Sequence, residues 1–190
     1  MGFAPGLYDM MIDDRDLVRA MNAEGMNTVL CAGCGVSNEP RALAEAGFQV
    51  VALDIAPRAI EIIQGLEFPS EVFERFCDDD MRKADGLVDY VVGDFFDHDV
   101  CSGPFDVIIE RRTAQLFSEN NYRTVMKALA DRVGPEGILL SHCHDGGWRP
   151  PAEPQHFTKS WFEENGWDYW DGRSGEKPAG RVAWLYITTG

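Results

Sequence analysis

Short apolar runs alternate with stretches of helical periodicity along most of the sequence. An unbroken apolar run is typical of a strand that is covered on both faces, as in a parallel sheet with helices on either side. Strands that alternate with helices in this way predict an α/β fold with a doubly wound parallel sheet. We expect strands around residues 29–30, 49–53, 87–92, 105–109 and 138–141.

The segments between these strands carry apolar residues at helical spacing, which predicts helices that pack one face on the sheet. Asparagine or proline stands near several of the expected starts, and glycine follows several of the expected ends. Asn120-Asn121 is expected to cap one of these helices, and the glycine-rich residues 134–137 to close it. The expected helices cover residues 17–21, 40–46, a segment that begins near Pro57, a surface helix over 67–86, and residues 120–133 and 157–165.

The alternation ends in the C-terminal part of the chain. Residues 171–180 contain three glycines and a proline and carry no apolar stripe at helical spacing, so they predict a turn rather than a crossover helix. The flanks 167–170 and 181–188 are rich in the aromatic and β-branched residues that strands prefer. We therefore expect a hairpin, with 181–188 as an interior strand between two neighbours.

The strongest local feature is a Gly-Cys-Gly sequence at residues 33–35, here called the glycine turn. It follows the first expected strand, and Ser-Asn-Glu-Pro at 37–40 is typical of a helix start. Glycine permits positive φ and a close approach of a ligand, and the first N–H groups of a helix carry partial positive charge. Asp54 ends the next strand, where a carboxylate can accept hydrogen bonds from both hydroxyls of a ribose. The pattern predicts half of a nucleotide-cofactor site, although an ordinary strand–helix turn remains an alternative.

These residues carry a resemblance to a known family. Residues 29–35, together with Asp54 and Gly-Asp-Phe-Phe at 93–96, resemble the class I S-adenosyl-L-methionine-dependent methyltransferases. The stretch 93–97, followed by Phe-Asp-Val-Ile-Ile-Glu-Arg at 105–111, is similar to the thiopurine methyltransferase-like branch. The resemblance covers residues 28–145 and continues more weakly to the C-terminus. One departure is Cys31, because the family often has an acidic residue two positions before the first glycine.

The resemblance implies a Rossmann-like, seven-stranded, mostly parallel sheet with a C-terminal antiparallel hairpin. It also implies S-adenosyl-L-methionine as cofactor and S-adenosyl-L-homocysteine as product. The glycine turn would lie against the amino-acid part of the cofactor, Asp94 would accept from the adenine amino group, and the backbone of Phe95 would meet the ring edge. The cofactor contacts expected in this way are Gly33, Cys34, Gly35, Asp54, Ile55, Gly93, Asp94, Phe95 and Glu110.

Candidate catalytic residues follow the fourth and fifth expected strands, at the edge where doubly wound sheets bind ligands. Arg111 or Arg112 can clamp an anionic substrate or a carboxylate, although a surface ion pair is equally compatible. His142 can act as a general base that Asp145 orients. A metal site that also uses Cys34 and a purely structural role are the alternatives. We assign the catalytic roles to Arg111, His142 and Asp145, and no metal.

Composition narrows the class of protein. The chain has 190 residues and is expected to form one domain, with an N-terminal cap segment (1–27), a cofactor-binding core (28–145) and a C-terminal helix and hairpin (146–190). Seventeen basic and 32 acidic residues give a net charge of −15, which disfavours nucleic acid as a partner.

Five irregularly placed cysteines do not predict a disulfide framework. The position of Cys31 at the strand end disfavours a redox role for the Cys31-x-x-Cys34 pair, because redox pairs normally lie at the beginning of a helix. No signal peptide or membrane span is expected, and free thiols fit a reducing compartment, so we predict a cytoplasmic protein. A small molecule is expected as the substrate.

The leading functional hypothesis is methyl transfer from S-adenosylmethionine to a sulfur, nitrogen, oxygen or halide acceptor by in-line displacement. A nicotinamide-dependent oxidoreductase is an alternative, although Asn38 replaces the third glycine of the dinucleotide motif and no Tyr-x-x-x-Lys is present. A non-catalytic module that binds S-adenosylmethionine is another. We take an antiparallel, interior last strand to indicate the methyltransferase. A last strand that is parallel to residues 29–30, or that lies on an exposed sheet edge, would exclude the methyltransferase architecture and favour the oxidoreductase.

Overall fold

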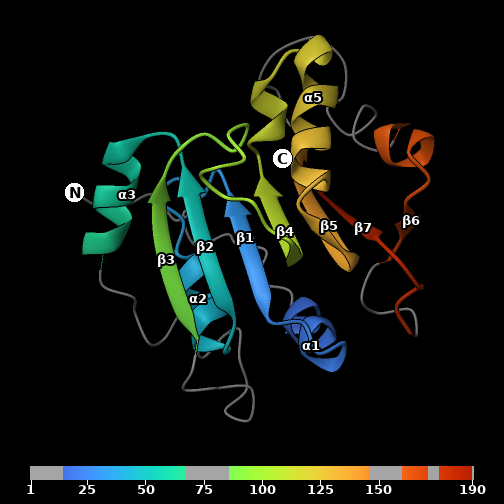
Figure 1. Cartoon of the computed structure of the whole chain (residues 1–190), viewed down its shortest axis with the longest axis horizontal. Helices are drawn as coiled ribbons and strands as arrows, with labels where there is room; N and C mark the ends of the chain where they lie inside the picture. The colour runs from blue at the N-terminus through green and yellow to red at the C-terminus, as the bar shows by residue number, and fades with distance from the viewer. Residues whose placement is uncertain (1–14, 67–85, 146–159, 171–175, 190) are drawn as a thin grey trace.

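The computed structural model describes residues 15–66, 86–145, 160–170 and 176–189. Within these residues a seven-stranded sheet has the order β3-β2-β1-β4-β5-β7-β6 (Figure 1). The expected doubly wound sheet is thereby confirmed. Its strands are β1 (Thr28–Ala32), β2 (Gln49–Asp54), β3 (Leu87–Val92), β4 (Phe105–Arg111), β5 (Val133–Asp145), β6 (Asp168–Tyr169) and β7 (Val182–Thr189).

The helices lie where the periodicity predicts them, with small differences at their ends. They are α1 (Arg15–Ala23), α2 (Glu39–Glu45), α3 (Pro57–Gly65) and α5 (Glu119–Ala130), with a 3-10 turn at Ala114–Leu116 and a helical stretch at residues 160–164. Helix α5 begins after Ser118 rather than at Asn120, and it ends before Val133 because Val133 already pairs with Phe105 of β4. The predicted surface helix over 67–86 falls on residues outside the described part of the chain.

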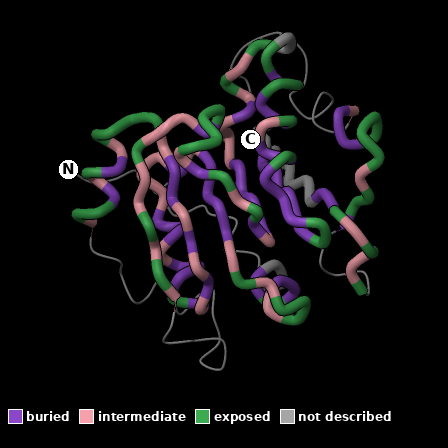
Figure 2. Tube along the Cα trace, viewed as in Figure 1, coloured by how far each residue is buried: buried purple, intermediate pink, exposed green. Residues whose placement is uncertain are grey.

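The sheet is buried on both faces. Successive side chains of a strand point to opposite faces, and along β1 Val29 and Cys31 join one apolar cluster while Leu30 and Ala32 join the other. Figure 2 shows buried residues concentrated in the central strands. The first cluster includes Met21, Leu43 and Ile60 of α1, α2 and α3, and the second includes Val125, Met126 and Leu129 of α5. None of the helices in the described residues is long and apolar enough to span a membrane.

The last strand corrects one prediction. Strand β7 lies between β5 and β6, as expected for an interior strand. However, it pairs parallel to both neighbours, so the predicted antiparallel hairpin is wrong. The Gly180 N–H donates to Glu136 Oε2 at 2.7 Å, and Lys177 Nζ lies 3.6 Å from the same oxygen. These contacts place the chain beside the amino end of β5 just before β7 begins.

Candidate functional site

The glycine turn is tied to the end of β2. Gly33 and Gly35 have φ of +67° and +55°, which glycine adopts readily. The N–H groups of Gly33 and Cys34 donate to the Leu53 carbonyl at 2.8 and 3.0 Å, and the N–H of Gly35 donates to Asp54 Oδ2 at 2.8 Å. The carboxyl ends of β1 and β2 therefore form one backbone unit.

The carboxylate of Asp54 is held from two sides. Besides the bond from Gly35, its Oδ1 accepts from the N–H of Ala56 at 2.8 Å. The residue is half-buried at the end of β2, and each carboxylate oxygen has a second lone pair. Asp54 is therefore oriented by the turn and keeps acceptor capacity for hydroxyl donors.

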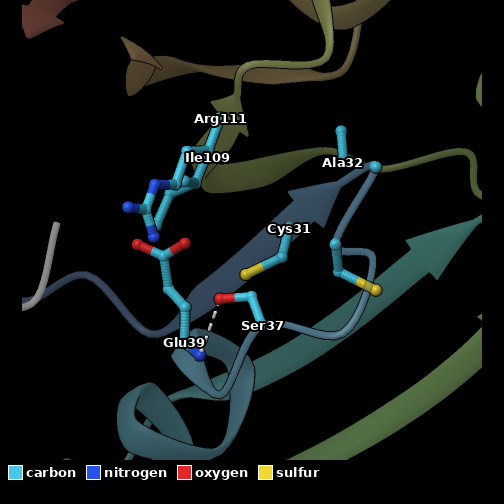
Figure 3. A pocket seen from close by; sticks show the side chains of 8 residues that line it. Cys31, Ala32, Ser37, Glu39, Ile109 and Arg111 are labelled. Carbon is cyan, nitrogen blue, oxygen red and sulfur yellow. Dashed lines mark hydrogen bonds between the residues drawn. The ribbon is translucent and has the colours of Figure 1, made fainter. Parts of the chain in front are cut away.

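A small pocket opens beside the glycine turn (Figure 3). We call it the glycine-turn pocket. Its walls come from the end of β1, the turn itself, the start of α2 and the end of β4, so parallel strand ends and a helix start converge on it. The lining residues are Cys31, Ala32, Gly33, Cys34, Ser37, Glu39, Ile109 and Arg111.

Glu39 brings a buried carboxylate into this pocket. The residue is 4% exposed, and its Oε1 has no hydrogen-bond partner among the described residues. Burial raises the pKa of Glu39 from 4.5 to about 7, and the positive charge of Arg111 opposes part of that rise. Figure 3 shows the Glu39 carboxylate directed toward the Arg111 guanidinium.

Arg111 and His142, two of the predicted catalytic residues, lie side by side in paired strands. Arg111 Nε donates to His142 Nδ1 at 3.1 Å, and His142 is 2% exposed. An Nδ1 that accepts from a guanidinium is engaged and does not serve as the proton-accepting atom toward a substrate. The backbone of Asp145 lies at the end of β5, and its side chain is outside the described ones.

Glu110, which the resemblance places against the cofactor, lies inside the protein instead. It is fully buried, and Ser141 Oγ donates to its Oε1. Its Oε2 accepts from the N–H groups of Thr113 and Ala114 at 3.2 and 3.0 Å. Burial raises the pKa of this carboxyl, and those hydrogen bonds oppose the rise. The observed contacts of Glu110 thus support the turn after β4.

That turn packs directly on the glycine turn. Thr113 Oγ1 lies 3.3 and 3.4 Å from the carbonyl oxygens of Ala32 and Gly33, within hydrogen-bond distance. A Cβ on Gly33 would overlap the Thr113 side chain, with Cγ2 only 2.7 Å away. Arg112, which directly precedes Thr113, has φ of +60°, and its N–H donates to the His142 carbonyl at 2.8 Å. Glycine at 33 is therefore required by close packing as well as by φ.

The loop after β3 lies at the same edge of the sheet. The N–H of Gly93 donates to the Asp54 carbonyl at 3.0 Å, and Asp94 Oδ1 accepts from the N–H of Phe96 at 2.9 Å. Phe95 is buried while Phe96 is 39% exposed, with ring centroids 4.7 Å apart. Ile55, after β2, is also exposed. This edge thus combines a half-buried carboxylate with exposed apolar side chains.

The cysteines of the site are held as neutral thiols. Burial raises the pKa of Cys31 well above its ordinary value, and nearby Glu39 adds to the rise. Burial and the charge of Asp54 raise the pKa of Cys34 to about 12. Redox chemistry and metal binding both need the thiolate, so this environment disfavours both roles for the pair.

Sequence reasoning missed Glu39, Ser37 and Ile109 as pocket residues. A signal for Glu39 was present, because positions 39, 42 and 43 share one face of a helix and Ala42 and Leu43 are apolar core residues. An acidic residue on a buried face indicates a functional or paired carboxylate. Ser37 and Ile109 carry no comparable signal.

Comparison with known proteins identifies similar methyltransferases. The family described as "Methyltransferase domain" matches residues 30–141. The cypemycin N-terminal methyltransferase of a Streptomyces species is 28% identical over 97% of this chain and 69% of its own length.

Solved structures agree in fold. The magnesium protoporphyrin IX methyltransferase of Synechocystis PCC 6803, solved with bound S-adenosylmethionine, is 18% identical with a TM-score of 0.57, over 88% of this chain and 76% of its own. The plantazolicin methyltransferase in complex with S-adenosylhomocysteine is 12% identical with a TM-score of 0.52, over 71% of this chain and 47% of its own. The chain spans about half the length of other solved relatives, 48% and 50% of two of them.

These matches outweigh the direction of β7, so a parallel last strand does not indicate the oxidoreductase here. The family match covers more than half of the chain and includes the glycine turn, Asp54 and the loop after β3. The chain therefore belongs to the methyltransferase-domain family, the class I enzymes that use S-adenosylmethionine.

Proposed function

We propose that this protein transfers the methyl group of S-adenosylmethionine to a small acceptor by in-line displacement. The observation that carries the proposal is the junction of the glycine turn with Asp54 beside the glycine-turn pocket. Asp54 would hold the ribose and the Asp94 loop the adenine. The sulfonium would then lie at the edge of the sheet where the acceptor arrives.

The reaction requires little of the protein beyond alignment of the acceptor with the methyl carbon. A lone pair of the acceptor forms the new bond to the methyl carbon while the carbon–sulfur electrons return to sulfur, which gives S-adenosylhomocysteine. The methyl group is already activated, so positioning supplies most of the acceleration. A neutral amine or a thiolate reacts without a strong base, which fits a site in which His142 Nδ1 is bonded to Arg111.

Two observations bear on the acceptor atom, and they favour different atoms. The cypemycin enzyme is named for methylation at an N-terminus, which favours an amine nitrogen. The stretch 93–97 is similar to the thiopurine methyltransferase-like branch, which favours a sulfur acceptor. We propose the amine first and the thiol second.

A labelled methyl donor tests the function. The full 190-residue chain is incubated with S-adenosylmethionine carrying a deuterated methyl group and with a peptide amine, an aromatic thiol, a phenol or iodide. Mass spectrometry should find the label on the peptide amine or on the thiol. The matched control is the same peptide with an acetylated N-terminus, which should stay unlabelled if the amine is the acceptor. Tight binding of S-adenosylhomocysteine with no labelled product from any acceptor would instead support a non-catalytic binding module.

Asp54→Ala is expected to weaken cofactor binding by about 1.5–3 kcal/mol, the scale of hydrogen bonds to a charged acceptor. Calorimetric titration with S-adenosylhomocysteine measures the change. Because Asp54 also holds Gly35 and Ala56, urea unfolding of the variant is recorded alongside, and the fold should survive. Equal affinity in variant and parent would remove Asp54 from the binding site.

Asp94→Ala is expected to weaken cofactor binding less than Asp54→Ala, because one adenine contact is lost while backbone contacts at Phe95 remain. Titrations with S-adenosylhomocysteine and with adenosine measure the effect, and both ligands should lose affinity to a similar degree. If both affinities match the wild type, Asp94 serves only to cap the N–H of Phe96.

A further inference from the structure

We propose that Glu39 and Arg111 together bind the amino-acid end of S-adenosylmethionine, Glu39 the ammonium and Arg111 the carboxylate. The inference rests on the proposed function and names the residues that select the charged end of the cofactor. It adds a positioning role for Glu39, and it gives Arg111 a cofactor partner in place of a substrate.

The pocket places one negative and one positive side chain beside the glycine turn. Among the described residues that line it, Glu39 is the one carboxylate and Arg111 the one cation. They project from α2 and β4 on the same side of the pocket, with Cys31 beside them and the glycine turn opposite (Figure 3). The same turn is bonded to Asp54, so a ligand whose ribose lies at Asp54 can extend past the turn to this pair.

One oxygen of the Glu39 carboxylate is available to a ligand. Its Oε1 is buried and has no hydrogen-bond partner in the part of the chain that the structure describes, and an unmet buried acceptor is costly. Such an atom in a pocket wall is suited to a ligand that donates hydrogen bonds and carries positive charge. An α-amino acid offers an ammonium with three donors next to a carboxylate. That pair of opposite charges a short distance apart matches the carboxylate and guanidinium of the pocket.

Cys31 does not supply this charge itself. Its thiol is buried and its pKa is well above the ordinary value, so it stays neutral near pH 7. It lines the same pocket as Glu39. The negative charge available in the pocket therefore comes from Glu39, in the first turn of α2.

Binding should therefore release a proton. The charged and titratable groups around Glu39 are Arg111, its neighbour His142, and the thiols of Cys31 and Cys34. With a pKa of about 7, free Glu39 is largely protonated near pH 6, and an ammonium ligand requires it ionised. Proton release on binding should be close to one near pH 6 and should fade as the pH rises above about 8.

The test compares ligands with and without the amino-acid end. Wild-type protein and Glu39→Gln are titrated with S-adenosylhomocysteine and with 5′-methylthioadenosine, near pH 6 and pH 8 in buffers of different ionisation heat. Glu39→Gln should lose about ten- to 100-fold in affinity for S-adenosylhomocysteine and none for methylthioadenosine. Proton release near pH 6 should be seen only for wild type with S-adenosylhomocysteine.

A second variant addresses Arg111. Arg111→Lys keeps the charge but not the planar fork of donors. It should weaken S-adenosylhomocysteine binding several-fold while leaving decarboxylated S-adenosylmethionine, which lacks the carboxylate, at its wild-type affinity. Equal losses for both ligands would remove Arg111 from the carboxylate contact.

Folding is checked by denaturation of the free proteins. The raised pKa of Glu39 means that its ionisation destabilises the fold as the pH rises from about 4.5 to about 7. The amide of Glu39→Gln does not ionise, so this variant should be at least as stable as wild type near pH 8. A ligand-specific loss in a stable variant is then a loss of binding.

The outcomes separate this inference from the proposed function. If wild type binds neither S-adenosylhomocysteine nor methylthioadenosine, the proposed function fails. If wild type binds S-adenosylhomocysteine and Glu39→Gln binds it equally well, the inference is overturned while the function stands. A variant with unchanged affinity and a lower kcat would assign Glu39 to proton transfer, which also overturns the inference.

Discussion

Gly33→Ala is expected to lower the free energy of unfolding by about 2–5 kcal/mol. A left-handed backbone conformation costs about 1–2 kcal/mol for a residue with a Cβ. The new methyl group would also overlap the Thr113 side chain, and such overpacking costs about 1–3 kcal/mol. Urea unfolding measures the loss, and affinity for S-adenosylhomocysteine should fall in the same variant because the turn is displaced.

Gly35→Ala is the matched control for this variant. Gly35 also has positive φ, at +55°, but a Cβ there would have no atom of the described residues within 4 Å. It should therefore show only the backbone cost of about 1–2 kcal/mol. Thr113→Ala in the Gly33→Ala background should recover part of the lost stability, since it removes the overlapping atoms. Equal losses for the two glycine variants would contradict the close packing of Gly33 on Thr113.

Glu110→Ala is expected to destabilise the protein by about 2–4 kcal/mol. The change leaves the N–H groups of Thr113 and Ala114 without their acceptor, and Ala114 is fully buried, so water does not replace the carboxylate easily. Chemical unfolding monitored by far-ultraviolet circular dichroism measures the loss. The turn after β4, which carries the strained Arg112, should loosen as well.

Glu110→Gln keeps the volume of the side chain and one acceptor oxygen, so its loss should be intermediate. The amide NH₂ that replaces the second oxygen does not accept from backbone N–H groups or from the Ser141 hydroxyl. A Glu110→Ala protein with wild-type stability would show that these hydrogen bonds contribute nothing net to folding.

The glycine turn and Asp54 were predictable from the sequence because they depend on local rules and on one simple topological fact. Glycines between a strand and a helix indicate a tight turn, and adjacent parallel strands end at the same edge of a sheet. The bond from Gly35 to Asp54 follows from that arrangement. The helices α2 and α3 were predictable for the same kind of reason, with Pro40 and Pro57 near their starts.

The direction of β7 was not predictable in this way. A glycine-rich segment fits a hairpin and an extended return equally well, because composition says nothing about where its ends are anchored. The anchor is Glu136, which lies 44 positions before Gly180 in the sequence. Only a contact over that separation decides that β7 begins beside the amino end of β5.

The buried carboxylates show a second limit of prediction from the sequence. Glu39 and Glu110 both stand in ordinary sequence surroundings, yet one reaches a pocket beside Arg111 and the other bonds Ser141 inside the protein. Their burial depends on strands that the chain supplies far away in sequence. The expected cofactor contact of Glu110 came from the resemblance, and the side chain that reaches the pocket is Glu39.

The most direct measurement is a calorimetric titration of the full 190-residue chain with S-adenosylhomocysteine and, separately, with NADH. The glycine turn and Asp54 are compatible with the ribose of either ligand, so the two titrations compare the two cofactor classes at one site. We expect saturable binding of S-adenosylhomocysteine and no heat above dilution for NADH. Saturable binding of NADH without binding of S-adenosylhomocysteine would contradict a methyltransferase site at this turn.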